Sequence, residues 1–190
     1  MFFADLFLFR DTPYLYARDS SRAPLLIPFF QLAMGTSYGF LVAFFQNNAQ
    51  IILHGINVEH MPGKIVFGGN IISGILVALI FHGGVTIIVW LMAKGVGGAG
   101  NLAMLYRTTA YLLPQALLAL PFIASRSVLP GGGFEVLPYS GLYTPLASYA
   151  LISSIVGLFH IFRVTQQINI QRCAVAVLFT VLFCSAVLML

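Results

Sequence analysis

The sequence predicts an all-α membrane protein: a bundle of five transmembrane helices with its N-terminus in the cytoplasm and its C-terminus outside. Of its 190 residues, 59% are hydrophobic and 7% are charged, and the mean hydropathy is +0.96. Such a composition is too apolar for a water-soluble surface. Long apolar runs recur at the length of a bilayer crossing, and the basic residues are divided unequally between the connections.

Five segments are long enough to cross a bilayer core about 30 Å thick, which takes roughly 20 residues of α-helix. They cover residues 24–45, 65–93, 108–125, 142–162 and 173–190, and none contains Asp, Glu, Lys or Arg. A β-barrel would instead show strands of about 10 residues with alternating polarity. The chain therefore divides into an N-terminal segment, 1–23, and a transmembrane domain, 24–190.

The distribution of Lys and Arg predicts the orientation. Of the nine, only Lys64 and Arg126 lie in the first and third connections. The other seven share the opposite side: Arg10, Arg18, Arg22, Lys94, Arg107, Arg163 and Arg172. This bias places the N-terminus in the cytoplasm, with Arg10, Arg107, Arg163 and Arg172 in a basic cytoplasmic rim. Anionic lipid accounts for the net charge of +4, so no nucleic-acid partner is expected.

The N-terminal segment predicts a short helix lying along the cytoplasmic face of the membrane. Residues 1–9 are apolar except for Asp5, and basic and acidic residues follow them up to Arg22. A signal peptide is not expected, because a basic start is missing and Arg10 and Asp11 stand where a small-residue cleavage site would be. The alternative is an unstructured tail, which would leave its Phe and Leu side chains in water.

Small and polar residues inside the spans predict contacts between helices. Gly35 and Gly39 form a GxxxG pattern, which lets two helix backbones approach closely, and Ser153 and Gly157 repeat the spacing. Pro114 removes a backbone donor midway along the third span and is expected to bend it. The polar side chains expected to point inward and hydrogen-bond across the bundle are Gln31, Asn70, His82 and Gln115.

No catalytic, cofactor-binding or metal-binding residues are expected. Cys173 and Cys184 lie eleven residues apart in one predicted helix, about 16 Å, which is too far for a disulfide. His54, Glu59 and His60 could surround a cation in the outer connection, but they match no established ligand spacing. An ordinary exposed loop is the favoured interpretation.

Two alternatives to a binding or scaffolding role remain open. A transporter or channel for a small solute, ion or lipid would need a continuous polar cavity lined by Gln31, Asn70, His82 and Gln115. Proton-coupled carriers place Asp, Glu or His in the path, and His82 is the only such residue deep in a predicted span, since His160 lies near the cytoplasmic end. The second alternative is an accessory subunit of a larger membrane complex.

Several short motifs resemble a known family. DLFLFRD at 5–11 and RAPLLIP at 22–28 resemble the entry of bacterial members of the Yip family, the Ypt/Rab-interacting multi-pass membrane proteins. YRTTAYLLP at 106–114 is similar to the start of that family's third span. GLFHIFR at 157–163 and QRCAVAVL at 171–178 resemble its last connection and final span.

The resemblance implies five helices, a cytoplasmic N-terminus and an outward C-terminus. Eukaryotic relatives act in traffic between endoplasmic reticulum and Golgi, and associate with prenylated small GTPases or with one another. This sequence has no long cytoplasmic region before its first span, and DLFLF at 5–9 replaces the usual Asp-Leu-Tyr-Gly-Pro, so small-GTPase binding is not expected. We expect a non-enzymatic protein of the bacterial inner membrane, or of endoplasmic reticulum or Golgi membranes in a eukaryote. It would bind other membrane proteins, self-associate or organise the bilayer.

Overall fold

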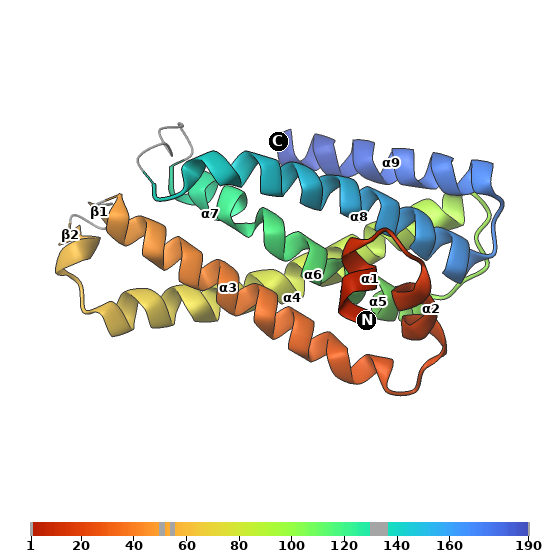
Figure 1. Ribbon diagram of the computed structural model, residues 1–190, viewed down its shortest axis with the longest axis horizontal. Helices are drawn as coiled ribbons and strands as arrows, with labels where there is room; N and C mark the ends of the chain where they lie inside the picture. Colours follow the sequence, from red (N-terminus) through yellow and green to blue (C-terminus); the bar gives the residue numbers. More distant parts are fainter. Residues whose placement is uncertain (1, 50–51, 54–55, 130–136, 190) are drawn as a thin grey trace. The chain divides into compact units, whose positions relative to one another are not determined.

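The computed structural model describes residues 2–49, 52–53, 56–129 and 137–189 (Figure 1). The described chain consists of helices and their connections, with an antiparallel pair of two-residue strands, β1 (Ile52–Leu53) and β2 (Ile56–Asn57). The helices are α1 (Phe2–Phe7), α2 (Thr12–Asp19), α3 (Leu26–Asn48), α4 (Gly63–Gly95), α5 (Leu102–Thr109), α6 (Leu113–Ala116), α7 (Leu120–Val128), α8 (Tyr143–Gln166) and α9 (Ile170–Met189). The all-helical class predicted from the sequence is confirmed.

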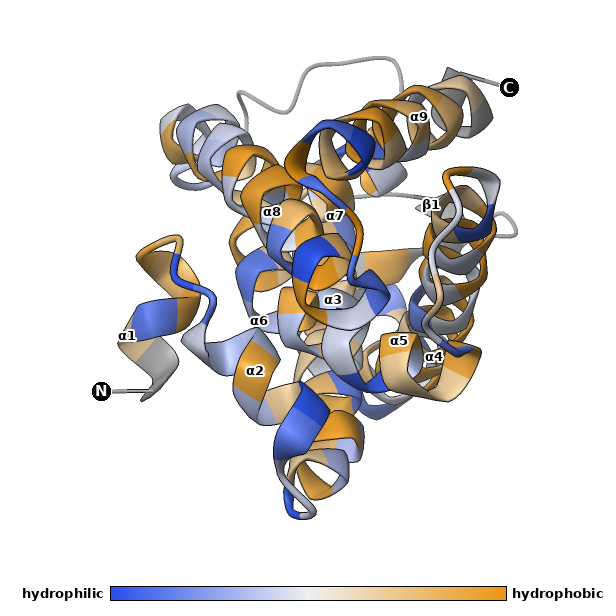
Figure 2. Ribbon diagram, turned by 90° about the vertical axis from the view of Figure 1, so that its right-hand side faces the viewer, coloured by the Kyte–Doolittle hydropathy of each residue, from blue (hydrophilic) through white to orange (hydrophobic). Residues whose placement is uncertain are grey.

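Among the described residues, four helical stretches are long and apolar enough to cross a membrane: Ala23–Asn48, Gly63–Gly95, Leu102–Val128 and Ser140–Gln166. They correspond to the first four predicted spans and indicate a membrane protein. Each extends a few residues beyond the predicted bounds, because the helices continue into the polar ends of the apolar runs. The apolar part of α9 covers Ile170–Ala186 and is shorter. Figure 2 shows α9 mainly in the colours of hydrophobic residues, but its crossing of the membrane stays a prediction.

The third candidate span is interrupted by 3₁₀ turns at 110–112 and 117–119. Pro114 lies in the first turn of α6, and Pro121 lies in the first turn of α7. A proline lacks a backbone N–H, and the first turn of a helix is the position that tolerates this loss best. The span therefore advances as three short α-helical pieces, where the sequence predicted one helix bent at Pro114.

The N-terminal segment contains two helices rather than the single one predicted. Phe9 has a φ of +56°, a left-handed conformation that ends the first helical stretch. Pro13, in the first turn of α2, starts the second. Leu6, Tyr14 and Ala17 are buried, so α1 and α2 pack against the chain and do not form a tail.

Contacts group the described residues into two compact units. The first contains residues 1–30, 80–115 and 152–190, and the second contains residues 31–79 and 116–151. Large side chains at the centre of the first unit are Leu6, Tyr14, Leu105, Tyr111, Ile161 and Phe162. In the second unit, a cluster forms from Val42, Phe45, Ala124, Leu137 and Tyr143.

In the second unit, α3 and α4 are in backbone contact at three glycines. A Cβ atom added to Gly39 would lie 2.6 Å from the Cα of Ile71, and one added to Gly35 would lie 2.5 Å from the Cα of Ile75. A Cβ on Gly74 of α4 would lie 2.8 Å from the Gly39 amide nitrogen. No room therefore exists for a side chain at these positions. The GxxxG pattern of α3 serves a contact within the chain.

A polar contact accompanies this glycine contact. The Asn70 side-chain amide donates to Gln46 Oε1 at 3.0 Å and to the Val66 carbonyl at 2.8 Å. The first of these bonds joins α4 to α3. Such a bond between membrane helices contributes roughly 0.6 kcal/mol, so the close backbone packing is the larger restraint on this helix pair.

We predict that Gly39→Ala destabilises the protein, whereas Gly84→Ala does not. The added methyl group forces α3 and α4 apart at Gly39, and overpacking of this kind costs about 1–3 kcal/mol. A Cβ on Gly84, also within a helix, meets nothing within 4 Å, so that variant keeps or slightly raises stability. Thermal unfolding in detergent, followed by circular dichroism, compares the two. Equal melting temperatures for Gly39→Ala and the wild type would contradict the contact.

Candidate functional site

The described part of the first unit holds two clusters centred on buried polar side chains, and a pocket that opens to the surface. We call them the Tyr14 cluster (Tyr14, Gln115, Gly157 and His160), the His82 cluster (His82, Thr86, Tyr106 and Thr109) and the Arg172 pocket, whose lining is given below. The Tyr14 cluster fixes the N-terminal segment, the His82 cluster joins α4 to α5, and the pocket lies beside the turns that end α4 and begin α9.

In the Tyr14 cluster, Gln115 of α6 binds the N-terminal segment. Its side-chain Nε2 donates to the Leu6 carbonyl at 2.6 Å and to the Tyr14 hydroxyl at 3.0 Å. Gln115 is only 2% exposed, so both bonds form away from solvent. Burial raises the pKa of the Tyr14 hydroxyl above its ordinary value, an effect larger than the opposing effect of the Gln115 bond. The hydroxyl is therefore neutral and able to accept.

Helix α8 completes this cluster through Gly157 and His160. The His160 Nε2 lies 3.1 Å from the Phe9 carbonyl oxygen, which only accepts, so Nε2 carries the proton. The His160 ring stacks on Tyr14 with centroids 6.1 Å apart. A Cβ on Gly157 would lie 2.5 Å from Leu112 Cδ2 and would also clash with the Tyr14 hydroxyl. The glycine therefore makes room for Tyr14.

Two acceptors of this cluster lack a donor within the described part of the chain: Gln115 Oε1 and His160 Nδ1. A buried acceptor without a hydrogen bond costs about 1–3 kcal/mol. The Tyr14 cluster is consequently less stable than a fully bonded network of the same size. It holds the N-terminal segment by a few bonds that a single substitution can disrupt.

The end of α2 is attached separately. Arg18 donates from Nη1 to the Val164 carbonyl of α8 at 3.1 Å, and it also pairs with Asp19 at 2.6 Å. The hydrogen bond from Arg18 lowers the pKa of the exposed Asp19 carboxyl. The Asp19 pair is exposed and contributes little to stability, so the bond to α8 is the structural part of this contact.

In the His82 cluster, the side chain that was the best candidate for proton transfer is bound by its neighbours. His82 is 1% exposed, and its Nε2 lies 3.2 Å from Thr109 Oγ1. Thr109 Oγ1 also lies 2.8 Å from Thr86 Oγ1 and 2.8 Å from the Leu105 carbonyl. The His82 ring packs on Tyr106 with centroids 4.4 Å apart. These contacts fit a structural histidine that links α4 to α5.

The inward-pointing residues predicted from the sequence fall into separate groups. Gln31, Pro114 and Ser153 are buried. Asn70 bonds Gln46 within the second unit, whereas Gln115 and His82 belong to the two different clusters of the first. The structure therefore gives each of these polar side chains its own local contacts. Sequence reasoning missed the partners Tyr14, Thr86 and Thr109, because a single sequence does not show which distant residues contact Gln115 and His82.

The turns beside the Arg172 pocket are held by Gln166, the last residue of α8. Its Oε1 accepts from the Gly100 amide at 3.0 Å, and a Cβ on Gly98 would lie 2.5 Å from that oxygen. Lys94 donates to the Gly98 carbonyl at 3.1 Å. These bonds fix the connection between α4 and α5 against the end of α8.

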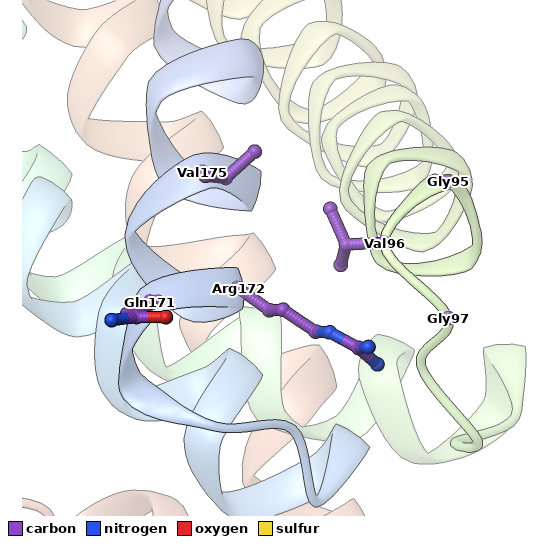
Figure 3. Close-up of a pocket in the computed structure, with 6 residues that line it drawn as sticks. All are labelled: Gly95, Val96, Gly97, Gln171, Arg172 and Val175. Carbon is purple, nitrogen blue, oxygen red and sulfur yellow. The ribbon is translucent and has the colours of Figure 1, made fainter.

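The pocket itself has a volume of about 540 Å³ and is open to the surface (Figure 3). Its lining consists of Gly95, Val96, Gly97, Gln171, Arg172 and Val175. Figure 3 shows the Arg172 side chain extending from α9 toward the turn at Gly97. The pocket thus combines one guanidinium group with glycine backbone and two valine side chains.

The remaining predicted residues lie at the surface or outside the described part. Arg107 and Arg163 are exposed, and Arg10 pairs with Asp5 at 2.9 Å. His54 and the side chain of Glu59 lie outside the described residues, and His60 is exposed. Within the described ranges, no group of three His, Cys, Asp or Glu side chains is placed to hold a metal ion.

No family model matches the chain, and no characterised protein or solved structure is significantly similar to it.

We predict that Gly157→Ala releases the N-terminal segment. The methyl group displaces Tyr14, and overpacking that costs about 1–3 kcal/mol raises the released fraction at least several-fold. Trypsin should then cleave after Arg10 and Arg18 at least several-fold faster than in the wild type, as measured by mass spectrometry of the products. Gly83→Ala is the control, because a Cβ there meets nothing within 4 Å. Equal cleavage in both variants would show that Tyr14 does not fix the segment.

Proposed function

We propose that this chain is a non-enzymatic multi-pass membrane protein that acts by binding other membrane proteins, a second copy included, or by organising the local bilayer. The observation that supports it best is the outer face of α4. Ile80, Gly84, Ile87 and Leu91 follow the spacing of one helix face. Ile80 is 74% exposed, and the space beside Gly84 is open for at least 4 Å.

This face has the composition of a helix-binding surface. A glycine between large aliphatic residues lets a second helix approach closely, as Gly74 does within this chain. The most apolar window of α4 is 22% buried, the lowest value among the four candidate spans. A helix with so little burial of its own has most of its surface available to lipid or to another helix.

The proposed topology has five spans, with α9 as the fifth, a cytoplasmic N-terminus and an outward C-terminus. Seven of the nine Lys and Arg residues on one side support it, as does the resemblance to the Yip family. In this arrangement α1 and α2 lie at the cytoplasmic face. The proposed location is the bacterial inner membrane, and binding of nucleic acid or of a small GTPase forms no part of the proposal.

The contacts of His82 count against a proton-coupled transporter. Its Nε2 bonds the Thr109 hydroxyl, which in turn bonds the Thr86 hydroxyl, and Gln115 bonds the N-terminal segment. Side chains that are hydrogen-bonded in this way fit a role in helix packing better than a role in a translocation path. An accessory subunit of a larger membrane complex stays the second alternative, and the exposed aliphatic face of α4 is compatible with it.

For topology, we expect a cytoplasm-dependent fluorescent reporter to give signal when fused to the N-terminus and none when fused after Leu190. A reporter active only outside the cytoplasm should give the reverse pattern at both ends. The reason is the basic rim, since translocating seven positive charges is disfavoured. Cytoplasmic signal from both fusions would mean an even number of spans and would contradict the five-span topology.

For partner binding, we expect Gly84→Leu to lower the amount of partner protein that co-purifies with the chain from native membranes. The decrease, at fixed stoichiometry in the wild type, should be at least several-fold. The leucine fills the space that a second helix would use. Quantitative mass spectrometry of the purified complex measures a partner of different sequence. Light scattering detects a second copy of this chain. Leu151→Ala, at an exposed position of α8, is the control and should change neither. A monomeric wild type without a stoichiometric partner would overturn the protein-binding role.

A further inference from the structure

We propose that the Arg172 pocket binds the phosphate headgroup of an anionic phospholipid. This inference goes beyond the proposed function, because it names a ligand and requires no protein partner. It stands on three observations in the first unit: the shape of the pocket, the charge around it, and the apolar surface that leads away from it.

The shape of the pocket leaves the guanidinium group accessible. Gly97 has a φ of +85° and no side chain, and a Cβ built there would lie 3.5 Å from Arg172 Nη1. The Arg172 side chain therefore lies along the backbone of this turn, with the Gln171 amide as the other polar side chain of the lining. Five N–H donors on a planar group match the oxygens of a phosphate.

The charge around the pocket favours an anion. Residues 94–101 and 163–172, which flank it, contain Lys94, Arg163 and Arg172 but no Asp or Glu. In the described chain, Asp5 forms an ion pair with Arg10, and Asp19 forms one with Arg18. The charges of these two carboxylates are therefore balanced by other arginines than Arg172. A bound phosphate would therefore meet net positive charge.

The apolar surface beside the pocket favours a lipid over free phosphate. Val96 and Val175 line the pocket, and Val175 is 42% exposed. Phe179 and Leu182 continue from Val175 at the spacing of one helix face, and both are exposed. Acyl chains can follow this stripe of α9 while the headgroup stays at Arg172. The lining has no aromatic residue on which a nucleotide base could stack.

The predicted orientation places the Arg172 pocket on the side of the membrane where anionic lipid is found. Arg172 belongs to the basic rim that the charge distribution assigns to the cytoplasmic side. The inner leaflet carries anionic lipid, and each basic side chain near such a surface contributes favourably to binding. The pocket would therefore face the leaflet that supplies its ligand.

The only tryptophan of the chain provides the readout. Trp90 lies on α4 five residues before Gly95, about 8 Å along the helix. The purified full chain is reconstituted in phosphatidylcholine vesicles with rising fractions of brominated phosphatidylglycerol or brominated phosphatidylcholine. Quenching of Trp90 fluorescence then gives the relative affinity of the two lipids near the pocket. We expect a preference of about fivefold for phosphatidylglycerol, the factor typical of one basic side chain near an anionic surface.

Variants identify the side chain responsible. Arg172→Gln should lower the preference to about onefold, and Arg172→Lys, which keeps the charge but not the planar set of donors, should retain only part of it. Arg22→Gln, which removes an equal charge from another exposed position, should leave it unchanged. A salt titration tests the electrostatic origin of the preference in the wild type. The preference should fall as sodium chloride rises from about 0.05 to 0.5 M, because salt screens the attraction between charges.

Three results would overturn the lipid site. The first is a wild type without preference, and the second is a preference that survives Arg172→Gln or is lost equally in Arg22→Gln. The third is loss of the preference when inorganic phosphate is added at constant ionic strength, which would assign the pocket to free phosphate. The vesicles contain no other protein, so failure here leaves the partner-binding experiment on Gly84 unaffected.

Discussion

Polar groups in the apolar part of this chain must find partners within the chain, because lipid offers none. Thr86, Thr165 and Thr180 each donate to the carbonyl four residues earlier. Gln115 reaches outside its own helix and bonds the carbonyl of Leu6 and the hydroxyl of Tyr14. The docking of the N-terminal segment thus follows from the same requirement as the helices themselves. A glutamine buried in the third span needs partners, and the segment supplies them.

The parts of the fold that depend on local sequence were predictable. The length of the apolar runs and their lack of charged residues located the four candidate spans. A run of that length predicts a membrane-spanning helix without any knowledge of tertiary contacts. The two-helix form of the N-terminal segment was not predictable, because it depends on the left-handed φ of Phe9, and a phenylalanine gives no signal for that conformation. The 3₁₀ turns around Pro114 and Pro121 were predictable only in part, since a proline indicates that a helix is interrupted but not the geometry of the interruption.

The site shows the same division between residues and their partners. A glutamine or histidine inside a span points inward for energetic reasons that the sequence displays, so Gln115 and His82 could be singled out. Their partners are Tyr14, which lies 101 residues from Gln115, and Thr109, which lies 27 residues from His82. A single sequence contains no record of such pairings. The partners of these two residues therefore emerged only from the contacts, which join α4 to α5 and attach the N-terminal segment.

Helix α4 shows why small residues alone cannot assign a surface. Gly74 and Gly84 lie in the same helix, ten residues apart. Gly74 packs against the backbone of α3, and its substitution would disturb the fold, whereas the space beside Gly84 is open. Both are glycines inside one apolar helix, so the contacts around them distinguish a glycine that packs within the chain from one with open space beside it. Exposed aliphatic residues lie around Gly84, which is why the partner-binding proposal rests on this part of α4.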